Sequence, residues 1–229
     1  MCSSDLFPGE AHEVVPRRAI DWTAPLDITE SPFIRDRIMY YWPNHFLPFE
    51  DWIDFAAKMR LNRITFLYGP PAIDWYTAQR ARLQGEVKKR GLMIEVGGHL
   101  RPERLPREMF PEHPDWFPRN AAGARVPTFN RNPFNRDALE YVGNRAVSYF
   151  GRIPEASLYH AWPDDIVGGG WTSEPGKEDY TPSDQSLVVM NHIATRLREK
   201  LPQAKDAFLA YHHTVEAARV VNPAPRSEV

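Results

Sequence analysis

The sequence has almost no cysteine, no excess of charge of either sign and no long hydrophobic run. Cys2 is the only cysteine among 229 residues, which excludes a disulfide within the chain. The formal net charge is −2 and the sequence pI is near 6.5, which argues against nucleic acid or an anionic membrane as partner. No apolar run reaches the roughly 18 residues of a membrane span. The 42% hydrophobic and 25% charged residues are typical of a globular domain with one core.

Short segments at both ends are unlike natural protein sequence. Met1–Leu6 resembles a translated sequencing adapter, and Arg226–Glu228 resembles its reverse-strand counterpart. These segments predict a fragment with artefactual tails at residues 1–6 and 222–229. Residues 7–30 are polar and punctuated by proline, so we expect a linker or the end of an upstream domain there.

Strand-like and helix-like segments alternate over residues 31–221. Stretches rich in β-branched and aromatic residues predict strands at Ile34–Trp42, Arg63–Tyr68, Leu92–Val96, Ser157–Trp162 and Ala207–Tyr211. Apolar residues at 3.6-residue spacing predict helices from Pro48, over Asp74–Arg90, over Asn135–Phe150, and from a cap at Ser183 to Pro202. Gly91 is expected to end the second helix, and Gly97-Gly98-His99 to end the third strand.

Two long, proline-rich connections break this rhythm, at residues 100–133 and 163–182. Both follow strands, so both are expected at the C-terminal ends of a parallel sheet. This asymmetry favours an α/β fold that is a partial (β/α)₈ TIM barrel, about the first five βα units, over residues 31–221. Such a partial barrel has open sheet edges, so we expect the fragment alone to be poorly stable and inactive.

The predicted strand Ser157–Trp162 ends in two adjacent carboxylates, Asp164 and Asp165, after Pro163. Strand ends at this face of a barrel carry catalytic groups. Cleavage of a glycoside needs an acid that protonates the leaving oxygen and a second group that stabilises the cationic centre. Adjacent acids fit a substrate-assisted scheme better than an opposed pair on two strands. In that scheme the acetamide of the sugar attacks, one acid orients it, and the other donates the proton.

Aromatic and hydrogen-bonding residues stand at the ends of the other predicted strands. Aromatic faces pack against the C–H faces of a sugar, while its hydroxyl groups need polar partners. The substrate-binding candidates are Trp42, Asn44, Tyr68, His99, Trp162, Tyr211 and His213, and Tyr40, His45 and His212 lie at the same strand ends.

Structural roles are open for several of these residues. An Asp-Asp pair after proline is common in turns, and His99 beside two glycines also fits a buried, hydrogen-bonded histidine. Trp42 and Trp162 also fit the barrel core, and Glu95, inside a strand, fits a paired structural acid. No zinc-binding pattern accompanies His212-His213, and the sequence has no phosphate loop or nucleophile elbow. No metal and no cofactor are therefore expected.

An ordered set of short motifs resembles one bacterial family, the domain-of-unknown-function family 4838. The motifs are Arg37–Trp42, Gly97–His99, His113–Phe117, Asn132-Pro133, Trp162–Asp165, Ser183-Asp184 with Asn191, and Ala210-Tyr211. The resemblance implies a glycoside-hydrolase-like barrel related to hexosaminidases and endo-β-N-acetylglucosaminidases. It also implies that Asp165 is the general acid, Asp164 its partner, and the protein secreted or periplasmic.

The leading hypothesis is a retaining, substrate-assisted glycoside hydrolase that acts on N-acetylhexosamine-containing glycans. A non-catalytic carbohydrate-binding barrel and a metal-dependent barrel enzyme are the alternatives. The expected partner is an oligosaccharide or glycan, and nothing in the sequence indicates the oligomeric state.

Overall fold

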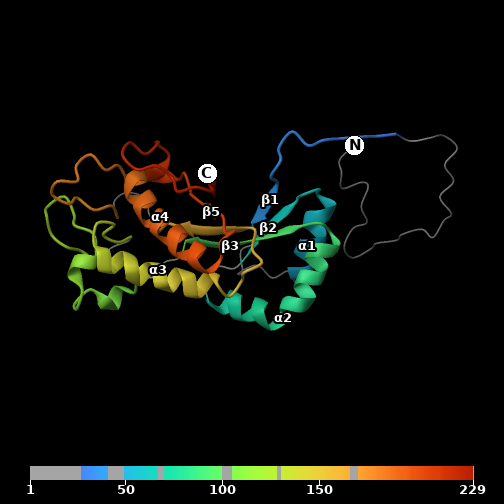
Figure 1. Cartoon of the computed structure of the whole chain (residues 1–229), viewed down its shortest axis with the longest axis horizontal. Coiled ribbons are helices and arrows are strands. Elements are labelled where there is room, and N and C mark those ends of the chain that lie inside the picture. The colour runs from blue at the N-terminus through green and yellow to red at the C-terminus, as the bar shows by residue number, and fades with distance from the viewer. Residues whose placement is uncertain are drawn as a thin grey trace.

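The computed structural model describes residues 27–40, 49–66, 70–99, 105–127, 130–165 and 170–228 (Figure 1). The strands are β1 (Ile38–Tyr40), β2 (Arg63–Phe66), β3 (Met93–His99), β4 (Leu158–Trp162), β5 (Asp206–Ala207) and β6 (Ser227–Glu228). The α-helices are α1 (Phe49–Lys58), α2 (Pro70–Lys89), α3 (Arg136–Phe150) and α4 (Pro182–Lys200). Short 3₁₀ turns occur at Arg107–Met109 (η2), Pro114–Trp116 (η3) and His212–Thr214 (η4).

The six strands form one parallel sheet whose order follows the sequence from β1 to β6. A doubly wound sheet reverses its strand order at a switch point, whereas the strands of a (β/α) barrel keep the order of the chain. The order does not reverse anywhere among the described strands. The predicted α/β class and partial (β/α)₈ barrel are thus confirmed, with β6 as a sixth strand that the sequence did not predict.

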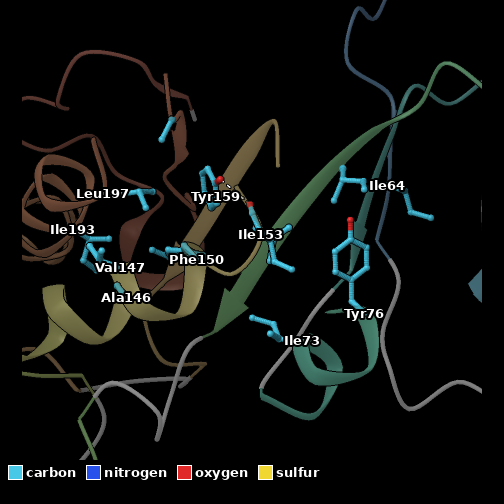
Figure 2. Close-up of a cluster of buried hydrophobic side chains, with 14 of the residues drawn as sticks. Ile64, Ile73, Tyr76, Ala146, Val147, Phe150, Ile153, Tyr159, Ile193 and Leu197 are labelled. Carbon is cyan, nitrogen blue, oxygen red and sulfur yellow. Dashed lines mark hydrogen bonds between the residues drawn. The ribbon is translucent and has the colours of Figure 1, made fainter. Parts of the chain in front are cut away.

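The helices cover the outer face of this sheet and enclose the hydrophobic core. Side chains alternate between the two faces of a strand, and those of Ile64, Val96 and Tyr159 join the core under the helices. Figure 2 shows Tyr159 of β4 against Phe150 of α3, with its hydroxyl group donating a 2.9 Å hydrogen bond to the carbonyl of Ile153. Burial raises the pKa of Tyr159 to about 12, so the phenol stays neutral.

Strand β3 runs further than predicted and includes the glycines that were expected to end it. Gly97 and Gly98 have φ angles of 122° and 143°, which a residue with a side chain rarely adopts. A Cβ on Gly97 would lie 2.0 Å from the carbonyl oxygen of His160 on β4. The glycines let two strands approach closely, and this is why the sheet continues through them to His99.

Helix α4 begins at Pro182 and its cap is Thr181, so the predicted cap at Ser183 is wrong. The Thr181 hydroxyl accepts a hydrogen bond from the Asp184 N–H (3.2 Å), and the Asp184 carboxylate accepts one from the Thr181 N–H (2.9 Å). This reciprocal pair is a capping box, and the proline after the cap has the backbone angle of a first helical residue. Ser183 instead lies buried within the first turn.

The carboxylate of Asp184 also holds the chain between β5 and β6. It accepts hydrogen bonds of 2.7–3.2 Å from the backbone N–H groups of residues 219–221. Burial raises the pKa of Asp184, but the bonds from Thr181 and these N–H groups outweigh burial, so the net pKa lies well below its usual range. One carboxylate therefore joins α4 to the last described segment.

The fifth strand is shorter than predicted, because β5 covers only Asp206-Ala207 and the chain then leaves the sheet. Strand β6, at Ser227-Glu228, pairs with it in parallel. It lies in the segment 222–229 that the sequence analysis assigned to an artefactual tail, and the origin of that segment stays a prediction. None of the described helices is long and apolar enough to cross a bilayer.

Candidate active site at the C-terminal rim of the sheet

An aromatic cluster lies at the C-terminal ends of β1, β3 and β4. The ring of Trp162 stacks on Tyr40 with centroids 5.5 Å apart, and His99 meets Trp162 edge-on at 5.2 Å. Tyr211, which follows β5, lies 6.0 Å from the His99 ring. These four residues are called the aromatic cup below. Strand ends far apart in the sequence therefore meet where the barrel topology places them.

His99 is oriented by the residue that ends β4. Its Nδ1 lies 2.6 Å from the carbonyl oxygen of Pro163. A carbonyl oxygen only accepts, so Nδ1 carries a proton in this hydrogen bond, and Nε2 remains for another partner. The predicted alternative of a buried, hydrogen-bonded histidine fits this geometry, yet the ring also forms part of the cup.

Asp165 reaches the cup from the β4 side. Its Oδ1 accepts a 3.2 Å hydrogen bond from the hydroxyl group of Tyr211, whose side chain is about 39% exposed. Burial and the negative charge of Asp165 raise the pKa of Tyr211, so its hydroxyl remains a donor near neutral pH. An exposed carboxylate beside aromatic rings can exchange a proton with a bound molecule.

Asp164 does not share the surroundings of Asp165. Its carboxylate pairs with Arg107 and accepts a 2.9 Å hydrogen bond from the Asn130 N–H, and its side chain is only 2% exposed. Its own N–H donates to the Asn130 side-chain oxygen at 2.9 Å. The sequence predicted both acids at one site, but only Asp165 borders the aromatic cup. Asp164 instead links the connection after β4 to the connection between β3 and α3.

A chain of charged groups lies on the inner face of the sheet below the cup. Glu95 of β3 is fully buried and accepts hydrogen bonds from Arg63 (2.8 Å) and Thr65 (2.9 Å), and its other contact is His160 Nε2 at 2.8 Å. Arg63 also pairs with Asp36 at 2.9 Å. Burial raises the pKa of Glu95, but the bonds from His160 and Arg63 lower it more, and the net shift is downward. The prediction of a paired, structural Glu95 fits this network.

Three predicted substrate-binding residues, Trp42, Asn44 and Tyr68, lie outside the described residues, as does His45. His213 is exposed in the turn η4, and His212 precedes it with a positive φ of 48°. The sequence predicted both histidines at the end of a strand, but they lie in a 3₁₀ turn. In the described part of the chain no group of three or more potential metal ligands occurs.

Sequence reasoning did not find Arg107, Asn130 or Arg131, which surround Asp164. All three belong to the long connection between β3 and α3, where no periodic pattern marks which side chains turn inward. The one signal was the Asn132-Pro133 motif, because Asn130 and Arg131 directly precede it.

Comparison with known proteins gives structural neighbours only. No protein-family model matches the chain, and no curated protein matches it in sequence. An exo-β-N-acetylglucosaminidase from Vibrio harveyi matches 78% of this chain and 36% of its own, with a TM-score of 0.51 and 14% identity. An α-galactosidase from Lactobacillus brevis matches 76% and 26%, with a TM-score of 0.47 and 11% identity.

The Vibrio enzyme shares the fold, and at this identity the match shows the fold alone. The match agrees with the expected fold class, a partial (β/α)₈ barrel. It spans about a quarter to a third of these neighbours, since it covers 26% and 36% of their lengths.

Proposed function

We propose that this chain is part of a glycoside hydrolase that acts on N-acetylhexosamine-containing glycans, with Asp165 as general acid and base. The observation that carries the proposal is the Asp165 carboxylate at the edge of the aromatic cup. Rings of Trp162, Tyr211 and Tyr40 offer flat apolar surface to a sugar, while His99 Nε2 and the Tyr211 hydroxyl offer hydrogen-bonding partners. The glycosidase-like fold and the family resemblance support the same class of substrate.

The proposed reaction is substrate-assisted. The proton of the Asp165 carboxyl group passes to the glycosidic oxygen as the bond from C1 to that oxygen breaks, and the acetamide oxygen of the sugar forms a bond to C1. Water then attacks C1, returns one proton to Asp165 and reopens the acetamide ring, with retention at C1. Tyr211 holds the Asp165 carboxylate through its hydroxyl group.

Asp164 has a positioning role in this proposal. Because its carboxylate is committed to Arg107 and Asn130, it fixes the loop that carries Asp165 and does not touch the sugar. This changes the hypothesis drawn from the sequence, in which Asp164 orients the acetamide.

The test is Asp165→Asn in the complete reading frame that contains this chain, assayed on an aryl N-acetylglucosaminide. We expect kcat to fall by roughly 10²-fold or more, as for other lost acid–base groups, with KM changed little. Asp137→Asn, an exposed acid in the first turn of α3, is the matched control and should keep full activity. An unchanged kcat in Asp165→Asn would refute the assignment.

A non-catalytic carbohydrate-binding barrel is the second candidate, because only one of the two adjacent acids borders the cup. It predicts that N-acetylglucosamine oligosaccharides bind with equal affinity to the wild type and to Asp165→Asn, without release of reducing sugar. Isothermal titration together with a reducing-sugar assay separates the two functions.

A further inference from the structure

A narrow cavity lies behind the end of β4, near the first turns of α4. Its walls include Asn130, Arg131, Ala161, Trp171, Gln185 and Ser186. The volume open to the centre of a water molecule is about 20 Å³. One water needs roughly 10–15 Å³ by that measure, so the cavity admits one very small ligand group. None of the aromatic cup residues or Asp165 lines it.

Two buried donors among the cavity residues have no acceptor. The Asn130 side-chain oxygen accepts from the Asp164 N–H, which fixes the orientation of the amide and leaves Nδ2 as the unused end. Nδ2 of Asn130 and Nε of Arg131 are both buried and have no hydrogen-bond partner in the described part of the chain. Unsatisfied buried donors are rare and costly, so this pair points to a missing acceptor.

Among the described residues around the cavity, Arg131 shares its nearest carboxylate with a second arginine. Asp164 attracts Arg131 and Arg107 repels it, but the Asp164 carboxylate is already committed to the ion pair with Arg107. Arg131 is 8% exposed and forms no ion pair with any described residue. Burial lowers the pKa of Arg131, which expresses the same cost of a buried cation.

We infer that this cavity binds a small monovalent anion, held by Arg131 and the Asn130 amide. The Arg131 guanidinium and Nδ2 of Asn130 only donate, which suits an acceptor without protons, and the space suits a halide ion or a single carboxylate group. A free ion and a carboxylate carried on an acidic sugar offer the same chemistry here. The site is separate from the proposed hydrolase chemistry, because it contains no residue of the aromatic cup.

The test compares thermal unfolding of the 229-residue chain in sodium chloride, acetate, glucuronate and isethionate at equal ionic strength. The sulfonate head group of isethionate is larger than a carboxylate group or a chloride ion, so isethionate serves as the reference. For an anion at about 20 times its dissociation constant, we expect Tm to rise by about 4 to 7 °C in wild type. Stabilisation by chloride identifies a free ion, and stabilisation by glucuronate but not chloride identifies a carboxylate on a sugar.

Arg131→Gln should abolish this rise, while Arg136→Gln, an exposed arginine five residues away, should keep it. Asp165→Asn should also keep it, so failure of the hydrolase proposal and failure of this site are distinguishable. Equal shifts in wild type and Arg131→Gln, or no shift with any anion, would overturn the inference.

A direct measurement covers the case in which Arg131→Gln does not fold. The ³⁵Cl NMR line of chloride should broaden on addition of wild-type chain and narrow again when acetate competes. A line that wild-type chain does not broaden, together with unchanged Tm in acetate and glucuronate, refutes the site.

Discussion

The two faces of the sheet are built from different chemistry. The outer face is apolar, with Ile64, Val96 and Tyr159 packed under the helices, whereas the inner face carries the fully buried Glu95 between Arg63 and His160. Apolar packing is non-directional and tolerates small shifts, but a buried charge needs each partner in place. The inner face therefore fixes the positions of strands β2, β3 and β4 relative to one another, directly below the aromatic cup.

The largest expected effect tests the close approach of β3 and β4. Gly97→Ala places a methyl group 2.0 Å from the His160 carbonyl oxygen, at a φ of 122°, so the backbone must move. We expect a loss of about 5 kcal/mol, comparable with the whole stability of a small domain, and little folded protein.

Gly85→Ala is the matched control, since Gly85 lies in α2 and an added Cβ there would meet no atom within 4 Å. It should stabilise the chain by about 0.5–1 kcal/mol in urea unfolding. If Gly97→Ala unfolds at the same urea concentration as wild type, β3 and β4 do not approach each other as closely as the 2.0 Å contact requires.

The next effect probes the outer face. Phe150→Ala removes a fully buried ring that packs edge-on against Tyr159 at 5.2 Å, and we expect a loss of about 4 kcal/mol in urea unfolding. Phe55→Ala, at a side chain that is 43% exposed, should cost less than about 1 kcal/mol. Similar losses at both positions would contradict an apolar core confined to this face.

The inner face should respond differently to single and double substitution. Glu95→Gln leaves His160 without its carboxylate partner and Arg63 with Asp36 alone, and we expect a loss of about 3 kcal/mol. The double variant Arg63→Met with Glu95→Met removes both charges and should recover most of that loss. Glu140→Gln, at a half-buried acid on α3 with ion pairs of 3.8 Å, is the control. Additive losses in the double variant would show that the network acts as independent residues.

The smallest effect concerns pH. The folded-state pKa values of Glu95 and Asp184 are lowered, so the stability that they contribute is present above their usual values of 4.5 and 3.8 and is lost as the pH falls. Burial raises the pKa of Asp206 despite its bonds to Ser227 and Arg198, so its contribution has the opposite sign and improves as the pH falls.

Urea unfolding between about pH 5 and pH 3 measures this difference. Glu95→Gln and Asp184→Asn should each reduce the pH-dependent loss by about 1 kcal/mol, whereas Asp206→Asn should increase it. A steeper loss in Asp184→Asn would reverse the sign assigned here.

The sequence predicted the helices and the order of the strands well, because both depend on local patterns. The amphipathic spacing around Ile53 and Ala56 gives α1 one face that packs into the core. Helix α2 ends just before Gly91, as expected, and Gly91 has a φ of 67°. The extent of β3 was not predictable in this way. In the sequence, Gly97 and Gly98 indicate a turn. Only the structure shows that Gly97 is needed because β4 lies too close for a side chain.

The candidate site was predicted only in part, for a similar reason. Strand ends at one rim follow from parallel topology, so His99, Trp162 and Tyr211 could be grouped from the sequence. Which of two adjacent acids borders the cup depends on partners from an irregular connection. Arg107 and Asn130 are 57 and 34 residues from Asp164 in the sequence, and no periodicity links them to it.

Asp164 and Asp165 are adjacent in the chain, yet their side chains contact different parts of the protein. Asp164 binds Arg107 and Asn130, and Asp165 binds Tyr211. Their Cα atoms are only about 3.8 Å apart, so one cannot shift without carrying the other. A change in the contacts of Asp164 with Arg107 or Asn130 will therefore also move Asp165 relative to Tyr211. The loop thus couples the hidden back of β4 to the open rim through a single peptide unit.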